Sequence, residues 1–266
     1  MQAMFLSNSK PFMCRVLLVI AFSVLPCQGL QAGEWVDGFK VGPFQLRSEF
    51  KLTEKHSLIK QLTRLQADLK TILQIEPSNR PIEINLFRSK GNYVNYLSER
   101  VPEGVGRQAL FVEGSDMGRV YLYRNYKYQT DLRHEVTHAI LHNALPYVPL
   151  WLDEGLAEYF EVPAKQRISG NSYLRSIRLA LFIGWKPHLS SLEEMSDVSE
   201  MRGSHYRDSW ACVHFCLNGS AEAKQTLVQY LKKIQKNDPP GRFSSHLERV
   251  HPRYESLIAA HIKRWK

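Results

Sequence analysis

The chain has 266 residues, of which 44% are hydrophobic and 23% are charged, so it can bury a sizeable core and is not a disordered protein. Its formal net charge of +9 makes it clearly basic. Of its four cysteines only Cys212 and Cys216 lie beyond residue 32, which is no disulfide framework. No G-x-S-x-G elbow is present, so a serine hydrolase lacks support, and there is no glycine-rich phosphate loop either.

Residues 1–32 have the composition of an export signal. They contain Lys10 and Arg15 but no acidic residue, and the apolar run Val16–Leu25 follows directly. A basic segment, a short apolar segment and then small residues occur in this order in signal peptides. We therefore expect a signal peptide and an exported protein, periplasmic or extracellular. An uncleaved membrane anchor is the weaker alternative, because about 20 apolar residues are needed to span a bilayer.

The basic charge of the chain bears on its partners. Removal of the predicted signal takes the net charge from +9 to +7. A basic exported protein can bind an anionic cell-envelope polymer, anionic lipid or an acidic polypeptide. A solvated cationic surface without a dedicated partner explains the charge equally well. Export argues against nucleic acid as the natural ligand, and we expect Lys232, Lys233 and Lys236 on one exposed face of a helix.

Strand signals are confined to the first half of the chain. Glycines and a proline punctuate aromatic and apolar residues over Trp35–Phe50, which indicates short strands or a hairpin. Ile82–Phe87 alternates apolar and polar residues, as a half-buried strand does. Gln108–Val112 and Arg119–Tyr123 flank a glycine-bounded turn, so we expect them to form an antiparallel hairpin.

Helical periodicity dominates the rest of the chain. Leucine and isoleucine recur at spacings of three and four over Thr53–Ile75, which is the strongest helix signal, and Tyr93–Leu97 indicates a shorter helix. From Thr130 the chain becomes helical, and Pro146 and Pro149 separate one helix from the next. Later helices are expected at Tyr173–Phe182, Asp208–Leu217, Ala221–Ile234 and Tyr254–Ile262.

Strands early and helices late predict an α+β fold. We expect a small, mostly antiparallel sheet packed against a helical half, within one domain that spans residues 33–266. Residues 33–128 would form its strand-rich part and residues 129–266 its helical part. Cys212 and Cys216 are spaced by four on a predicted helix, and a buried apolar pair is favoured there over a metal site.

The segment His134-Glu135-Val136-Thr137-His138 has the H-E-x-x-H pattern. Residues four apart on a helix lie one above the other, so the imidazoles of His134 and His138 can converge on one cation. Glu135 is rotated by about 100° from His134, and its carboxylate can reach a metal-bound water without being a ligand. The spacing therefore predicts two metal ligands and a general base on one helix.

A third ligand has to come from elsewhere, because catalytic zinc usually takes three protein ligands and keeps a fourth position for water. Glu154 is the candidate, since the turn Leu145–Pro149 allows its helix to fold back across the first one. The small Gly155 would let the two helix backbones approach closely. Glu158, one turn after Glu154, is placed to accept a hydrogen bond from the far nitrogen of a liganding histidine, although a surface or salt-bridging carboxylate fits it as well.

These residues resemble those of the gluzincin metallopeptidases, in particular the bacterial peptidase MA-like families. The families carry H-E-x-x-H followed by W-L-x-E-G-x-A-E-Y, matched here by His134–His138 and Trp151–Tyr159, and the close resemblance covers Thr130–Phe160. It implies a zincin-like fold with Glu135 as general base and later proton donor. It also implies that Zn²⁺ is bound by His134, His138 and Glu154.

The related enzymes also have an oxyanion donor, usually a Tyr or His further along the chain. This implies His205 or Tyr206 here, and packing of Tyr206 beside Trp210 is the alternative. Asp153 stands where better-known aminopeptidase relatives often have Asn, and no motif for a substrate amino terminus is present. Aminopeptidase activity is therefore not implied.

Two other residues compete as metal ligands. His142 lies about two turns from His134 on the same helix face, but three histidines in one line would leave the metal poorly enclosed. Asp153 points about 100° away from Glu154. The remaining histidines show no ligand spacing and are expected at the surface; they are His56, His188, His246, His251 and His261.

The whole pattern predicts a secreted zinc-dependent peptidase that hydrolyses a peptide or protein substrate through a zinc-bound water activated by Glu135. One alternative is a catalytically idle zincin-like scaffold that binds cell-envelope polymer or protein. Another keeps the metal but cleaves a different bond, as a cell-wall amidase would. The four intact site residues favour the enzyme, since an idle scaffold has no need of them.

Overall fold

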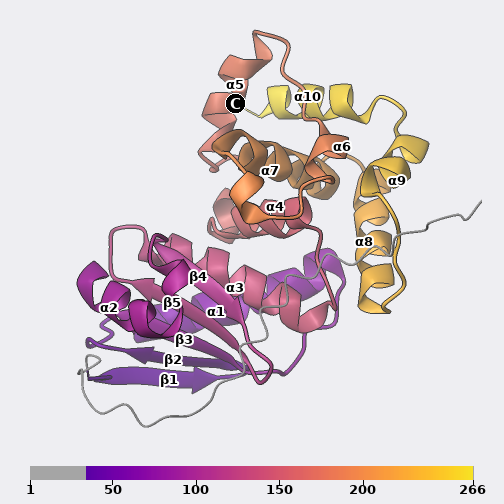
Figure 1. Cartoon of the computed structure of the whole chain (residues 1–266). Helices are drawn as coiled ribbons and strands as arrows, with labels where there is room; N and C mark the ends of the chain where they lie inside the picture. The colour runs from indigo at the N-terminus through magenta and orange to yellow at the C-terminus, as the bar shows by residue number, and fades with distance from the viewer. Residues whose placement is uncertain (1–33, 266) are drawn as a thin grey trace, which may run out of the picture. The chain divides into compact units, whose positions relative to one another are not determined.

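A computed structural model describes residues 34–265 of the chain. The predicted signal peptide, residues 1–32, lies outside the described residues. Within them the fold is α+β, with a five-stranded sheet that is complete at Tyr123 and only helices from Tyr128 onward (Figure 1). The strands lie in the order β1-β2-β3-β5-β4 and are β1 Asp37–Val41, β2 Phe44–Ser48, β3 Ile82–Phe87, β4 Ala109–Glu113 and β5 Gly118–Tyr123.

The sheet is mixed, so the prediction of a mostly antiparallel sheet is wrong. The two hairpins, β1 with β2 and β4 with β5, are antiparallel as their short turns predict. The pairings of β2 with β3 and of β3 with β5 are parallel. A helix lies between the paired strands in each of these two connections, and such a crossover returns the chain in its original direction.

Helices are found at every position where periodicity predicts one, whereas α6 and α9 have no predicted counterpart. The buried leucines of α1 repeat at the predicted spacings of three and four. Short 3₁₀ helices lie at Pro102–Gly104, Ala164–Gln166 and Val198–Glu200. The α-helices are α1 Lys55–Leu73, α2 Lys90–Arg100, α3 Tyr128–Ala144, α4 Leu150–Phe160, α5 Tyr173–Leu181, α6 Leu189–Leu192, α7 Gly203–Asn218, α8 Ala221–Gln235, α9 Phe243–Val250 and α10 Tyr254–Arg264.

The two faces of the sheet belong to different apolar clusters. Ile84 of β3 and Val120 of β5 are buried in the main core, together with the leucines of α1 and the inner face of α3. Tyr121, the next residue on β5, packs on the opposite face with Tyr93 and Leu97 of α2. Side chains alternate between the two faces of a strand, which explains this division. Helix α3 is thereby held against β4 and β5.

Helix α4 packs against both α3 and α7 (Figure 1). Its approach to α7 requires glycine at position 155, because a Cβ on Gly155 would lie 2.7 Å from the carbonyl oxygen of Ser209. The close helix approach predicted at Gly155 is therefore to α7 and not to α3. Cys212 and Cys216 on α7 are free and buried, as predicted. None of the helices formed by residues 34–265 combines the length and apolar character that crossing a bilayer requires.

Candidate metal centre

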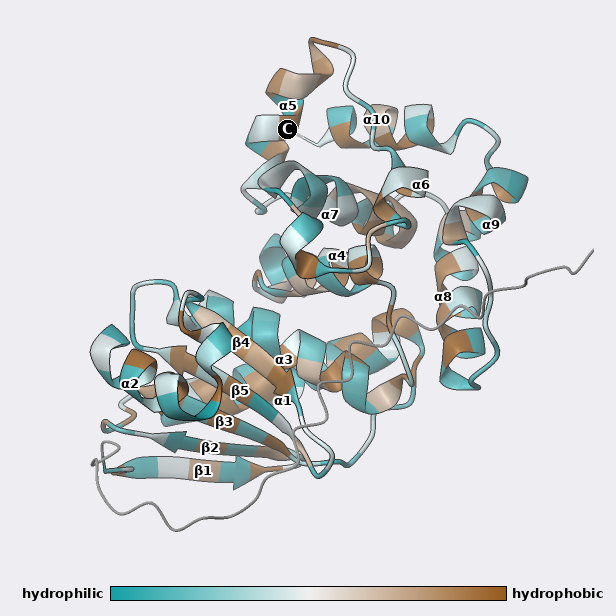
Figure 2. Cartoon of the chain, in the orientation of Figure 1, coloured by the Kyte–Doolittle hydropathy of each residue, from teal (hydrophilic) through white to brown (hydrophobic). Residues whose placement is uncertain are grey.

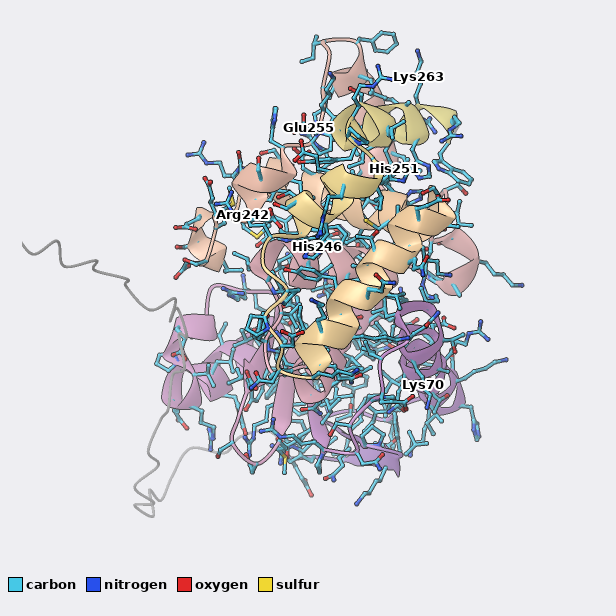
Figure 3. The ribbon with its side chains drawn as sticks, turned by 90° about the vertical axis from the view of Figure 1, so that its right-hand side faces the viewer. Lys70, Arg242, His246, His251, Glu255 and Lys263 are labelled. Atoms are coloured by element: carbon cyan, nitrogen blue, oxygen red, sulfur yellow. The ribbon has the colours of Figure 1, made fainter. Side chains whose placement is uncertain are left out.

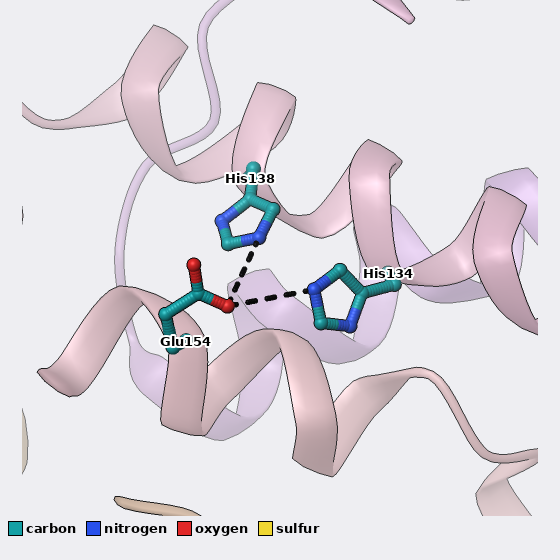
Figure 4. A group of neighbouring side chains, drawn as sticks. All are labelled: His134, His138 and Glu154. Atoms are coloured by element: carbon teal, nitrogen blue, oxygen red, sulfur yellow. Dashed lines mark ion pairs between the residues drawn. The ribbon is translucent and has the colours of Figure 1, made fainter. Parts of the chain in front are cut away.

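Helices α3 and α4 bring the three predicted ligands together. His134 and His138 lie one turn apart on α3, and their ring centroids are 4.9 Å from each other. Glu154 extends from α4 toward both rings, as Figure 4 shows. Its Oε2 atom lies 3.6 Å from Nε2 of His134 and 3.7 Å from Nε2 of His138. One ligand atom from each of the three residues therefore lies within 4.8 Å of the other two.

The spacing of these atoms fits a small cation between them. Zinc binds histidine nitrogen and carboxylate oxygen at about 2.0–2.2 Å in a tetrahedral arrangement, which places ligand atoms about 3.4 Å apart. The two distances from Glu154 exceed this value only slightly. They are also longer than normal hydrogen bonds, so the carboxylate is not bonded directly to either ring. Two imidazoles and one carboxylate form a donor set that suits zinc.

The surroundings of the two histidines favour positive charge. Burial by itself lowers the pKa of His134, yet the carboxylates of Glu154 and Glu161 outweigh it and hold that pKa well above its ordinary value. Burial also opposes the charged form of His138, and Asp153 in turn raises the pKa of this residue. A site that stabilises protons on two buried imidazoles also stabilises a metal cation at the same place.

Two carboxylates lie against the imidazole rings, and neither was predicted in this role from the sequence. Oε2 of Glu161, at the end of α4, lies 3.1 Å from Nδ1 of His134. Oδ1 of Asp153 lies 2.9 Å from Nδ1 of His138, and Oδ2 of Asp153 lies 2.9 Å from Nε2 of His142. Metal-binding histidines usually hold a carboxylate or carbonyl at the nitrogen that faces away from the metal. The arrangement therefore leaves Nε2 of both candidate ligands facing Glu154.

Asp153 and His142 form a pair behind the candidate ligands. Burial raises the pKa of Asp153, but the imidazoles of His138 and His142 hold it far below its ordinary value, so Asp153 is an anion. His142 also faces Glu113, with Nδ1 at 3.5 Å from a carboxylate oxygen. Its ring is directed to these two acids, and His142 is not part of the group of ligand atoms around Glu154 that the described residues form.

Glu158 does not make the hydrogen bond predicted for it. Its carboxylate accepts a hydrogen bond from the hydroxyl of Tyr173 on α5, with an oxygen-to-oxygen distance of 3.0 Å, and the histidine nitrogen is taken by Glu161 instead. Burial and the neighbouring Glu161 raise the pKa of Glu158 to about 7. One ligand atom each from His134, Glu158 and Glu161 also lie within 4.8 Å of one another, so the acid remains close to the centre.

Glu135 lies beside the three candidate ligands at an open cavity of about 430 Å³. Burial raises the pKa of Glu135, while the imidazoles of His134 and His138 and a hydrogen bond from the amide of Phe111 on β4 act in the opposite direction. A buried carboxylate with a raised pKa is suited to accept and return a proton. The cavity is lined by Arg107, Gln108, Ala109, Asp131, His134, Glu135, Glu158, Glu161, Val198 and Tyr206.

The structure separates the two candidate oxyanion donors. Tyr206 lines the same cavity as Glu135, and burial together with the nearby Glu154 raises the pKa of its phenol. His205 turns back on its own helix, where Nδ1 accepts a hydrogen bond from the backbone N–H of Arg202. Tyr206 is thus brought to the site, and His205 is not among the residues that line it.

A scan against models of protein families and a search among curated proteins find no match for this chain.

Proposed function

We propose that this chain is a zinc-dependent peptidase of the gluzincin type, built on a zincin-like fold. The observation that carries the proposal is the convergence of His134, His138 and Glu154 from two helices, next to Glu135 and an open cavity. Two nitrogens and one carboxylate oxygen leave a fourth tetrahedral position free for chemistry, as catalytic zinc sites do. We further propose that the protein is exported, as its first 32 residues predict.

Each residue of the centre has a defined role in this proposal. Zinc would be held by the two Nε2 atoms and by Oε2 of Glu154, and when bound it supplies a Lewis acid that polarises a carbonyl and makes water more acidic. Glu135 takes a proton from the attacking water and returns it to the leaving amine. Tyr206, which lines the same cavity, donates a hydrogen bond to the oxyanion.

Asp153 and Glu161 are positioning residues in the proposed enzyme. Each contacts the Nδ1 atom of one histidine, so each fixes the ring that presents Nε2 to the metal. A peptide or protein is the proposed substrate, because hydrolysis of an amide needs both an activated water and a proton donor for the amine, and Glu135 serves both steps.

Metal content combined with peptide cleavage tests the proposal. The purified wild-type protein should hold about one zinc per chain and cleave members of a proteome-derived peptide library. Glu135→Gln should keep the zinc and lose the cleavage, since it retains the shape of the side chain but cannot accept a proton. His138→Ala should lose both zinc and cleavage.

Three other outcomes would replace the proposal. A protein that holds no zinc at micromolar zinc would be a binding scaffold. A protein that holds zinc but cleaves only amide bonds of cell-wall peptide would be an amidase. Unchanged peptide cleavage by Glu135→Gln would remove Glu135 from its role as the base.

A further inference from the structure

The end of α5 exposes large apolar side chains to solvent. Phe182 and Ile183 are each 87% exposed and Leu179 is 68% exposed, whereas Leu174 and Ile177 on the other face of the helix are buried. Figure 2 shows the turn after α5 in brown, at the outer end of the helical half. Apolar residues scattered singly on a surface are common, but a contiguous group of this size usually marks an interaction site.

Hydrogen bonds fix the turn that carries these residues. Helix α5 ends in a tight turn in which the amide of Gly184 bonds to the carbonyl of Leu181 and the amide of Trp185 bonds to that of Ala180. Gly184 has a φ of 79°, which a residue with a side chain adopts only with strain. The indole of Trp185 donates a hydrogen bond to Asp208 at 3.0 Å and so ties the turn to α7. The turn therefore presents Phe182 and Ile183 outward instead of folding them into the core.

The chain segment that carries this turn is basic, although Asp208 and Glu255 of neighbouring helices contact Trp185 and His188 in it. From Val162 to Leu192 the chain contains five lysines and arginines but neither aspartate nor glutamate. Three of these cations, Arg175, Arg178 and Lys186, are exposed in the same segment as the apolar residues, and Arg178 also donates a hydrogen bond to the carbonyl oxygen of Trp265. The C-terminal end of α10 packs near α5 and adds Lys263, which Figure 3 places beside that helix.

We propose that the α5 tip, defined as Leu179, Phe182 and Ile183 together with Arg175, Arg178 and Lys186, docks onto the surface of an anionic phospholipid membrane. Apolar side chains at the end of a helix can enter the boundary between headgroups and acyl chains, while cations next to them contact the anionic headgroups. A soluble polyanion would engage the cations but would leave Phe182 and Ile183 in water. The combination of both features on one turn therefore favours lipid.

Binding to vesicles tests the proposal, with the full chain and also with the compact unit that begins at Gln31. The probe is vesicles of equal parts phosphatidylglycerol and phosphatidylcholine, compared with phosphatidylcholine alone. Wild type should bind the anionic vesicles and bind the neutral ones more weakly. Phe182→Ser combined with Ile183→Ser should weaken binding about tenfold to a hundredfold, because two exposed apolar side chains no longer enter the lipid.

Matched control variants distinguish binding through the α5 tip from binding through any exposed aromatic or basic residue. Tyr126→Ser removes another exposed aromatic residue, 92% exposed beside Lys127, and should leave vesicle binding unchanged. Arg175→Gln with Lys186→Gln should weaken binding to anionic vesicles about tenfold. Lys224→Gln with Lys236→Gln removes the same charge from α8 and the residue that follows it, and should have little effect.

Several outcomes would overturn the proposal. Equal binding by wild type and the Phe182, Ile183 double variant would show that the tip does not enter lipid. Equal loss in both charge variants would indicate a general basic surface. A further outcome is that wild type and the double variant bind soluble polyglutamate equally well, and as tightly as wild type binds vesicles. That result would assign the surface to a polyanion. Absence of vesicle binding, with a change of oligomeric state in the double variant, would assign it to contacts between copies of the chain.

Discussion

Two sets of histidines lie between packed helices in this protein, and their surroundings differ. The first set, His134, His138 and His142, is surrounded by carboxylates of α4 and of the end of β4. The second set consists of His214 on α7 and His261 on α10, whose ring nitrogens Nδ1 and Nε2 lie 2.9 Å apart. His138, His214 and His261 are buried and His134 and His142 are partly buried, so the clearest difference between the sets lies in the neighbouring groups.

The second set has aromatic and carbonyl neighbours where the first has acids. The ring of Trp210 lies 4.9 Å from that of His214, and Nε2 of His214 lies 2.9 Å from the carbonyl oxygen of Ile168. Burial lowers the pKa of His214 and that of His261 to about 4 each. The prediction that His261 lies at the surface is wrong, because only 2% of it is exposed.

The contrast shows what makes a histidine site favourable for a cation. In both sets burial disfavours the charged ring, but only the first set has carboxylates that reverse this effect and stabilise a cation. Helix α7 connects the two environments, since Tyr206 near its start lines the cavity and His214 two turns later belongs to the aromatic set. The following substitutions test this contrast.

The largest effect is expected from Glu154→Ala. The substitution removes the only carboxylate among the three candidate ligands, so zinc affinity should fall by more than the roughly 10–100-fold that loss of an outer partner costs. Competition with a chromogenic chelator measures this affinity. His214→Gln, in the aromatic set, should leave zinc affinity unchanged. Retention of tight zinc binding by Glu154→Ala would break the contrast between the two sets.

Tyr206→Phe should lower kcat for peptide hydrolysis about a hundredfold or more while zinc content stays the same. The substitution removes only the hydroxyl that would bind the oxyanion. Steady-state kinetics on a peptide identified from the library provide the measurement. His205→Ala is the matched control and should retain most of the activity, because His205 does not line the cavity. Similar losses in both variants would point to a disturbance of the start of α7.

The aromatic set should make the free energy of unfolding depend on pH. The folded pKa of about 4 lies below the ordinary value of 6.5, so full stability is present above pH 6.5 and is lost as the pH falls toward 4. For one histidine a shift of this size corresponds to about 3 kcal/mol. Urea unfolding at both ends of this range measures the loss.

His261→Gln is the control for this dependence. It removes one of the two titrating rings, so the loss of stability between pH 6.5 and 4 should be smaller than in wild type. The difference between variant and wild type cancels the contribution of acids elsewhere in the chain. If the free energy of unfolding depends on pH identically in the two proteins, protonation of the histidine pair does not destabilise the folded state.

A smaller effect is expected from Asp153→Asn and from Glu161→Gln. Each keeps the size of a side chain that contacts Nδ1 of a candidate ligand but removes its charge, so zinc affinity should fall about 10–100-fold. Glu158→Gln should have a weaker effect, because its carboxylate bonds to Tyr173 instead. The same chelator competition ranks the three variants. A larger loss for Glu158→Gln would contradict the observed division of roles.

Local patterns were sufficient to predict most of the elements. Periodicity located α1 and most helices after Thr130, and the spacing of His134 and His138 placed both on one face of α3. The parallel pairings of β3 were not predictable in this way, because strands that pair across a helix leave no turn signal between them. Short helices such as α9 offer too few turns to establish a period.

The centre shows the same limit at the level of side chains. Glu154 could be proposed because the chemistry of zinc requires a third donor near a known pair. The chemistry of zinc does not specify Asp153 and Glu161 in the same way, since any carboxylate that reaches Nδ1 would serve. Only the packing of α4 on α3 decides which carboxylate does so. His261 was placed wrongly for a similar reason, because its burial results from contact with α7.

The hydrogen bond between Phe111 and Glu135 affects the edge strand of the sheet. Strand β4 is the last in the order β1-β2-β3-β5-β4, and an outermost strand with free backbone groups invites strands of other molecules to add to it. The amide of Phe111 is already engaged by Glu135, so the row of backbone hydrogen-bonding groups along this edge strand is interrupted. The same carboxylate proposed to move protons thereby also occupies one backbone donor of this edge strand.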